Sequence, residues 1–126
     1  MPFRSIVLAA CAVLFLGGCG AVGDLSGAVV RVQACQDAIT ATGRLADRMP
    51  DVRDNPAELK KALRTAADEL DQAGAGAGDP TLGDALDGLA DLYRSLDPAG
   101  GAETIRRASA GTAKYLQVIT ASCAAQ

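Results

Sequence analysis

Residues 55–73, Asn-Pro-Ala-Glu-Leu-Lys-Lys-Ala-Leu-Arg-Thr-Ala-Ala-Asp-Glu-Leu-Asp-Gln-Ala, decide the fold class of this chain. Asn55 is a good helix N-cap, Pro56 suits the first helical position because no donor is needed there, and Glu58 stands where it can answer the cap. Apolar residues then recur at steps of three and four, at Leu59, Ala62, Leu63, Ala66, Leu70 and Ala73. This spacing predicts an amphipathic helix to about Ala73. The alternating glycines of residues 74–78 then predict a mobile loop.

The same helical period appears downstream. Asp79-Pro80-Thr81 repeats the cap-then-proline entry and predicts a helix that stops at residues 97–101. Its apolar stripe is Leu82, Ala85, Leu86, Leu89, Leu92, Tyr93 and Leu96. A further helix is predicted from about Ala102 to Ala124, with its stripe at Ile105, Ala108, Thr112, Tyr115, Leu116, Ile119 and Cys123.

Upstream, a first helix is predicted from about Ala28 to Arg48, and Pro50 is expected to end it because a proline disfavours helical backbone at the preceding residue. Its apolar stripe is Val29, Val32, Cys35, Ile39, Leu45 and Met49. No segment shows the alternation of a strand. Four amphipathic helices with short connections predict an all-α fold over residues 28–126, an antiparallel up-down-up-down four-helix bundle.

The N-terminal segment has the pattern of an export signal. Ile6 to Leu16 is a run of eleven apolar residues, too short to cross the roughly 30 Å hydrocarbon core of a bilayer as a helix. Leu16-Gly17-Gly18-Cys19 follows it, and this arrangement resembles the lipobox of bacterial lipoproteins. The resemblance implies that residues 1–18 are a signal peptide and that residues 19–27 form a glycine-rich tether.

The same resemblance implies that Cys19 becomes the first mature residue and carries diacylglycerol on its sulfur. The protein would then be exported and anchored to the membrane on its extracytoplasmic face. The alternative is an ordinary secretory signal cleaved near Cys19, which would give a secreted protein. The two interpretations differ only in whether the chain stays at a membrane.

Two cysteines remain after Cys11 and Cys19 are assigned to the signal and the anchor. In an oxidising compartment, Cys35 and Cys123 are expected to form a disulfide that joins the first helix to the last. Two free thiols are the competing interpretation. A metal site is the other, but it lacks partners because the chain has no histidine. If Cys123 is level with Cys35, residues 28–34 extend past the bundle toward the tether.

Composition restricts the partners and the core. Without the signal the chain has fifteen acidic residues against eleven basic ones, and this balance offers no basic stripe for nucleic acid. The core has to be built from aliphatic residues and many alanines, with Tyr93 and Tyr115 as its aromatic residues. Such a core leaves little room for a large internal ligand.

Candidate chemical groups are few. Asp84, Asp87 and Asp91 share one helix face and are interpreted as a solvated face, the alternative being a weak cation site or an acidic docking edge. Near the end of the first helix, Arg44, Arg48 and Arg53 are interpreted as surface charges that the interleaved Asp47, Asp51 and Asp54 neutralise, the alternative being a basic patch for lipid headgroups or an acidic partner. The pair Arg106 and Arg107 is likewise interpreted as surface charges. Tyr93 and Tyr115 are expected at the edge of the core, with ligand stacking as the alternative.

The chain is therefore not expected to be an enzyme and no cofactor or metal is expected, because the usual nucleophile–base pairs and phosphate-binding loops are absent from the sequence. The leading hypothesis is a non-enzymatic, membrane-tethered interaction module that binds an envelope protein. The alternative is a lipoprotein that binds a small molecule or lipid between its helices, which requires a pocket of roughly 300 Å³ or more.

Overall fold

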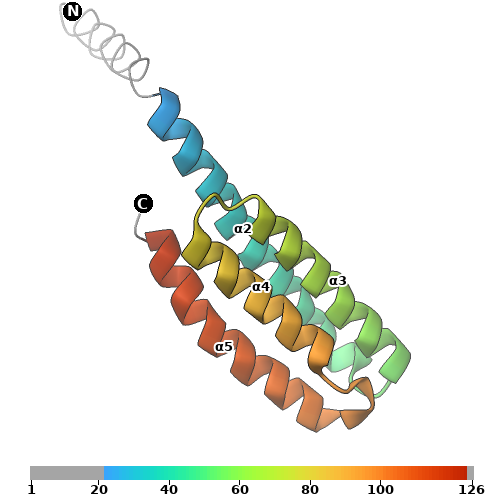
Figure 1. Cartoon of the computed structure of the whole chain (residues 1–126). Helices are drawn as coiled ribbons and strands as arrows, with labels where there is room; N and C mark the ends of the chain where they lie inside the picture. The colour runs from blue at the N-terminus through green and yellow to red at the C-terminus, as the bar shows by residue number, and fades with distance from the viewer. Residues whose placement is uncertain (1–21, 125–126) are drawn as a thin grey trace, which may run out of the picture.

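The computed structural model describes residues 22–124, with side chains from Arg31 onward. Four α-helices follow one another: α2 (Val22–Val52), α3 (Pro56–Ala75), α4 (Pro80–Ser95) and α5 (Ala102–Ala124), with the short 3-10 helix η2 (Pro98–Gly100) before α5. Neighbouring helices run antiparallel, and the chain closes because α5 packs against both α4 and α2 (Figure 1). The predicted up-down-up-down bundle is confirmed.

The two cap-then-proline entries begin helices as predicted. The Asn55 side chain accepts a hydrogen bond from the Glu58 amide at 3.3 Å, and the Asp79 carboxylate accepts one from the Thr81 amide at 2.9 Å. In each case the proline occupies the first turn, where its missing N–H costs no hydrogen bond. The Glu58 carboxylate, expected to answer the cap, lies 3.9 Å from the guanidinium of Arg48.

Helix α2 is longer than predicted at both ends. It begins at Val22, so residues 22–27 of the expected tether are helical, and Pro50 lies inside its last turn. A proline removes only its own helical donor, so the helix can continue for two residues past Pro50. The Arg53 amide still donates a hydrogen bond to the Met49 carbonyl at 3.1 Å. Residues 19–21 and the lipidation candidate Cys19 lie outside the described residues.

The N-terminal part of α2 extends past the other three helices, as Figure 1 shows. Ala34, which is 3% exposed, already belongs to the core. The Arg31 guanidinium lies 3.7 Å from the Asp79 carboxylate at the start of α4. The predicted extension is therefore confirmed for about the first turn of the expected segment 28–34 and ends at about Arg31.

The buried side of α2 differs from the predicted stripe. Val32 and Ile39 are 42% and 60% exposed, whereas the alanines of this helix are buried: Ala34, Ala38 and Ala41. Alanine lets two helices approach closely, so the alanine side of α2 packs against the core. Val32 and Ile39 lie on the outer side of the helix. The prediction that Val32 and Ile39 lie in the core is wrong. Cys35, Leu45 and Met49 are buried as predicted.

Cys35 on α2 and Cys123 on α5 form the predicted disulfide, with their Cα atoms 6.1 Å apart. The bond joins the first and last helices and spans 88 positions of sequence. Among residues 22–124, no helix combines the length and the hydropathy that crossing a membrane requires.

Candidate functional site

An apolar groove lies between α2 and α5, with a volume of about 260 Å³. We call it the α2–α5 groove and define it by the residues that line it: Thr42, Leu45, Ala46 and Met49 of α2, Tyr93 of α4, and Ala108, Ser109, Thr112, Ala113 and Leu116 of α5. Its floor belongs to the core, since Tyr93 and Ala108 are 1% and 0% exposed. Its rim is open to solvent at Ala46 and Ala113.

The groove exists because α5 is only partly buried against the rest of the bundle. Thr104, Ala108 and Ile119 are the buried residues of α5, whereas Leu116 and Tyr115 on its predicted core stripe are half-buried. The end of α5 is held to α2 by the disulfide, and its start is held by η2, where the Thr104 hydroxyl donates to the Asp97 carbonyl. Between these two attachments, α2 and α5 leave apolar surface uncovered.

The hydroxyl groups of the groove that are buried or half-buried already have partners. The Thr42 hydroxyl donates to the Ala38 carbonyl at 3.0 Å, and the Thr112 hydroxyl donates to the Ala108 carbonyl at 2.7 Å. Thr112 also accepts from Tyr93 at the floor. Burial raises the pKa of Tyr93 above its usual value of 10.0, and the hydrogen bond to Thr112 opposes that effect in part. Tyr93 is therefore a buried core residue, and its predicted position at the core edge is wrong.

The surface around the groove carries few charges. Residues 108–124 of α5 include one charged side chain, Lys114, and Val118 in the same segment is 43% exposed. Ile39 belongs to this surface as well, because Cys35, Ile39, Thr42 and Ala46 follow one another at steps of three and four and so lie on the same side of α2. Cys35 and Ala46 both face α5 from that side.

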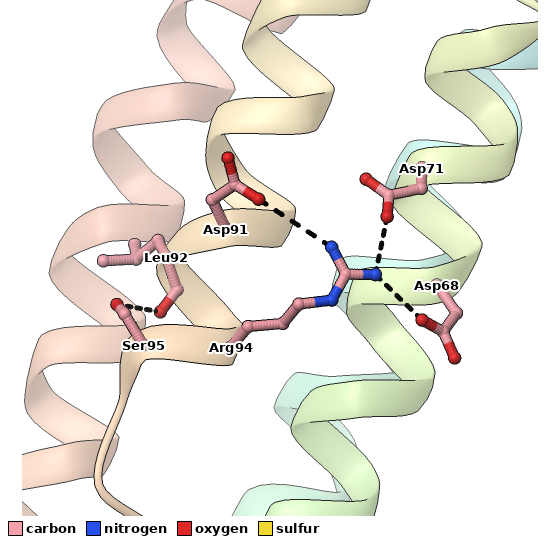
Figure 2. A network of polar contacts seen from close by, with 6 residues as sticks. All are labelled: Asp68, Asp71, Asp91, Leu92, Arg94 and Ser95. Carbon is pink, nitrogen blue, oxygen red and sulfur yellow. Dashed lines mark hydrogen bonds and ion pairs between the residues drawn. The ribbon is translucent and has the colours of Figure 1, made fainter.

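The acidic residues predicted on α4 lie on a face that is exposed to solvent. Asp84, Asp87 and Asp91 are exposed, and Asp91 lies 3.9 Å from Arg94. Figure 2 shows that Arg94 points across to α3, where it meets Asp71 at 2.5 Å and Asp68 at 2.8 Å. Hydrogen bonds to Asp71 and Asp68 raise the pKa of Arg94 further above its ordinary value. This Arg94 cluster ties α4 to α3 on the solvent side.

The predicted basic residues are likewise paired at the surface. Arg44 lies 3.4 Å from Glu69, and Arg53 lies 3.6 Å from Asp54. Of the three acidic residues expected to neutralise this group, Asp54 has that role, while Arg44 and Arg48 pair with α3 instead. Each of the three arginines therefore lies beside a carboxylate at the surface.

At the start of α5, Arg106 and Arg107 both bind Glu103, and their hydrogen bonds lower the pKa of its carboxyl group. Tyr115 is half-buried beside Gly88, at the edge of the core as predicted. The two tyrosines do not form the ligand-stacking pair that we considered, because Tyr93 is hydrogen-bonded inside the core.

Two larger hollows lie on other parts of the described surface. One, of about 470 Å³, lies on the polar surface between α2 and α3 and is lined by Asp37, Thr40, Arg44, Glu69, Gln72 and Ala73. The other, of about 550 Å³, is an open surface on the second half of α5. In the part of the chain that the structure describes, no group of three or more Cys, Asp or Glu side chains is arranged to hold a metal ion.

Sequence reasoning missed the α2–α5 groove because it assigned Ile39 to the core and seated α5 fully on the bundle. The signal that marks this surface in the sequence is the nearly charge-free segment 108–124. Fully amphipathic surface helices carry polar and charged residues opposite their apolar stripe. Alanine, glycine, serine and threonine occupy much of that outer side instead.

Comparison with known proteins gives one family. No curated protein and no solved structure matches the chain. The family defined by the domain of unknown function DUF8711 matches residues 29–124, which cover all of the bundle except the first turns of α2. The chain therefore belongs to the DUF8711 family.

Proposed function

We propose that this chain is a non-enzymatic interaction module, tethered to the extracytoplasmic face of a membrane through a lipid on Cys19, that binds an envelope protein at the α2–α5 groove. The observation that carries the binding role is the uncovered apolar surface between α2 and α5, where α5 is attached at both of its ends. An apolar groove whose walls are already held in place suits recognition, because binding a partner then costs little conformational entropy of this chain.

The tether is supported by the sequence. Leu16-Gly17-Gly18-Cys19 follows an apolar run of signal length, and the disulfide between Cys35 and Cys123 fits an oxidising compartment. Because α2 extends past the bundle on its N-terminal side, a stretch of helix would hold the groove away from the bilayer.

Binding of a whole small molecule or lipid is supported less well. The α2–α5 groove is an apolar hollow between helices, and at about 260 Å³ it is smaller than the roughly 300 Å³ at which ligand pockets begin. The larger hollows are a polar surface and a single-helix surface. The groove matches the scale of side chains that a partner inserts.

Membrane fractionation tests the tether. We expect the wild-type chain and the control Cys11→Ala, which changes the cysteine inside the apolar run, to be found in the membrane fraction. Cys19→Ala should be released in soluble form or accumulate as the uncleaved precursor. A Cys19→Ala chain that is processed and held at the membrane like the wild type would contradict the lipid anchor.

A further inference from the structure

We infer that the occupant of the α2–α5 groove is a helix of the partner protein whose contacting side bears aliphatic side chains and no charge. This inference rests on the proposed function and names the chemistry of the partner. It follows from the charge of the groove and its rim, from the state of its hydroxyl groups, from its size and from the position of Ile39.

Charge complementarity selects an uncharged partner. The ten residues that line the groove include no acidic or basic side chain, and the exposed positions beside it toward the disulfide are uncharged: Ile39 and Gly43 on α2, and Gln117 and Thr120 on α5. At its opposite end the exposed Arg53 and Arg106 are paired with Asp54 and Glu103. By contrast, α3 carries seven charged residues in its 20 positions. A charged side chain pressed into the groove would lose water and gain no counter-ion, which is strongly unfavourable.

The hydrogen bonds of the groove select aliphatic contacts. The hydroxyl groups of Thr42 and Thr112 donate to main-chain carbonyls of their own helices, and Tyr93 is bonded to Thr112. An acceptor group on the partner would have to displace one of these bonds to receive a hydrogen bond from Thr42, Thr112 or Tyr93. An aliphatic side chain displaces none and covers Leu45, Met49 and Leu116.

Size and shape select a helix. The groove runs between two antiparallel helices and continues into the open surface of α5 lined by Leu116, Gln117, Thr120, Ala121 and Ala124. A third helix can lie along this strip and place one large side chain in the groove as an anchor. Small residues on the rim, such as Ala46 and Ala113, allow its backbone to approach closely.

A second copy of the chain fits this surface poorly. Among residues 31–124, Ile39 is the most exposed of the large hydrophobic side chains, and it lies about six residues, or roughly 10 Å, along α2 from the middle of the groove. A symmetric dimer that inserts each Ile39 into the other groove therefore needs a two-fold axis across the helices. With that axis, the N-terminal ends of the two α2 helices, which begin at Val22, point in opposite directions. Two copies anchored in the same membrane could not adopt this arrangement.

Site-specific photo-crosslinking in the cells that make the protein tests this inference. The full-length chain carries p-benzoylphenylalanine in place of Gln117, at the groove rim, or in place of Asp84, an exposed position on α4 that serves as the control. The crosslinked peptides are then sequenced by mass spectrometry. We expect the Gln117 position to give an adduct with a helical partner peptide that has aliphatic residues at steps of three and four and no charge on that side.

Two variants of the Gln117 chain make the test quantitative. Ala113→Lys and Ala46→Lys each place a charge on the rim at an exposed position, one on each wall, and should reduce the adduct by at least about tenfold. Ala75→Lys, an exposed alanine at the end of α3, is the matched control and should leave the adduct unchanged. Thermal unfolding followed by circular dichroism checks that the variants fold equally well.

Four results would overturn the inference: an adduct with a peptide of this same chain, an adduct with the mass of a lipid, a partner segment with charges on its contacting side, or no adduct that distinguishes Gln117 from Asp84. The tether is tested separately by Cys19→Ala. A soluble, secreted chain that still gives the expected helical adduct would remove the anchor and leave the docking site.

Discussion

The hydroxyl groups of Tyr93 on α4 and Thr112 on α5 are hydrogen-bonded to each other at the floor of the α2–α5 groove. Tyr93 is 1% exposed and is the largest fully buried side chain of the bundle. Thr112 lies on the helix whose predicted core stripe is only partly buried. This bond therefore connects the well-packed core to the most loosely seated helix.

Replacing Tyr93 by phenylalanine keeps the ring and removes the bond to Thr112. The Thr112 hydroxyl keeps its bond to the Ala108 carbonyl, so no buried donor is left without a partner. We expect the free energy of unfolding to fall by about 1 kcal/mol, measured by urea denaturation at neutral pH. An unchanged stability would show that the bond contributes nothing to holding α5.

Tyr93 also predicts a pH dependence. Burial raises the pKa of Tyr93 in the folded protein, whereas in the unfolded chain it ionises near its ordinary value of 10.0. Above about pH 10 the unfolded chain loses this proton first, so the free energy of unfolding falls as the pH rises toward the folded-state pKa. The wild type and Tyr115→Phe should show this loss in urea denaturation between pH 8 and 11. Tyr93→Phe should lack it, and equal slopes in all three would contradict the assignment.

The disulfide predicts a large effect of reduction. The bond between Cys35 and Cys123 closes a loop of about 89 residues, and the chain-entropy estimate of its stabilisation is roughly 4.6 kcal/mol. The double variant Cys35→Ala, Cys123→Ala should unfold at a much lower urea concentration, and dithiothreitol should shift the wild type and leave the double variant unaffected. Native thiols that react with a dye before reduction would contradict the bond.

Two glycines predict opposite effects of the same substitution. A Cβ at Gly88 would lie 2.8 Å from the Cε1 atom of Tyr115, so Gly88→Ala has to displace a ring at the core edge. Gly43 has no atom within 4 Å of its Cβ position, so Gly43→Ala gains helix propensity without a clash. We expect Gly43→Ala to stabilise by about 1 kcal/mol and Gly88→Ala to destabilise by about 1 kcal/mol or more in urea denaturation. Similar shifts for both would disprove the close contact.

The Arg94 cluster predicts a salt-dependent effect. Arg94→Gln leaves Asp68, Asp71 and Asp91 near one another without their shared cation. Because these groups are exposed, the urea midpoint should fall modestly at low salt, and the difference from wild type should shrink in high salt. Arg64→Gln, at an exposed position on α3, is the control and should change little. A loss for Arg94→Gln that is independent of salt would contradict an electrostatic origin.

The sequence was sufficient to predict α3, α4 and α5, because their starts are marked by caps or glycine breaks and their apolar stripes are regular. The disulfide also followed from the number of cysteines and the order of the helices. These features depend on local signals and on topology, which a single sequence contains.

The orientation of α2 did not follow from the sequence. Val32 and Ile39 are more hydrophobic than Ala34, Ala38 and Ala41, so hydrophobicity alone places the wrong face in the core. The outcome depends on how closely α2 approaches its neighbours, which is a property of the packed bundle. The α2–α5 groove was missed for the same reason, because it depends on how far α5 is buried against its neighbours, which is also a property of the packed bundle.

The measurement that tests the central claim most directly is the intact mass of the protein extracted from membranes without reductant. A lipid-anchored, disulfide-linked chain predicts a polypeptide that begins at Cys19, carries the added mass of a diacylglycerol and lacks two hydrogens for the bond between Cys35 and Cys123. An unmodified chain recovered from the medium, or a chain that retains both hydrogens, would contradict the account.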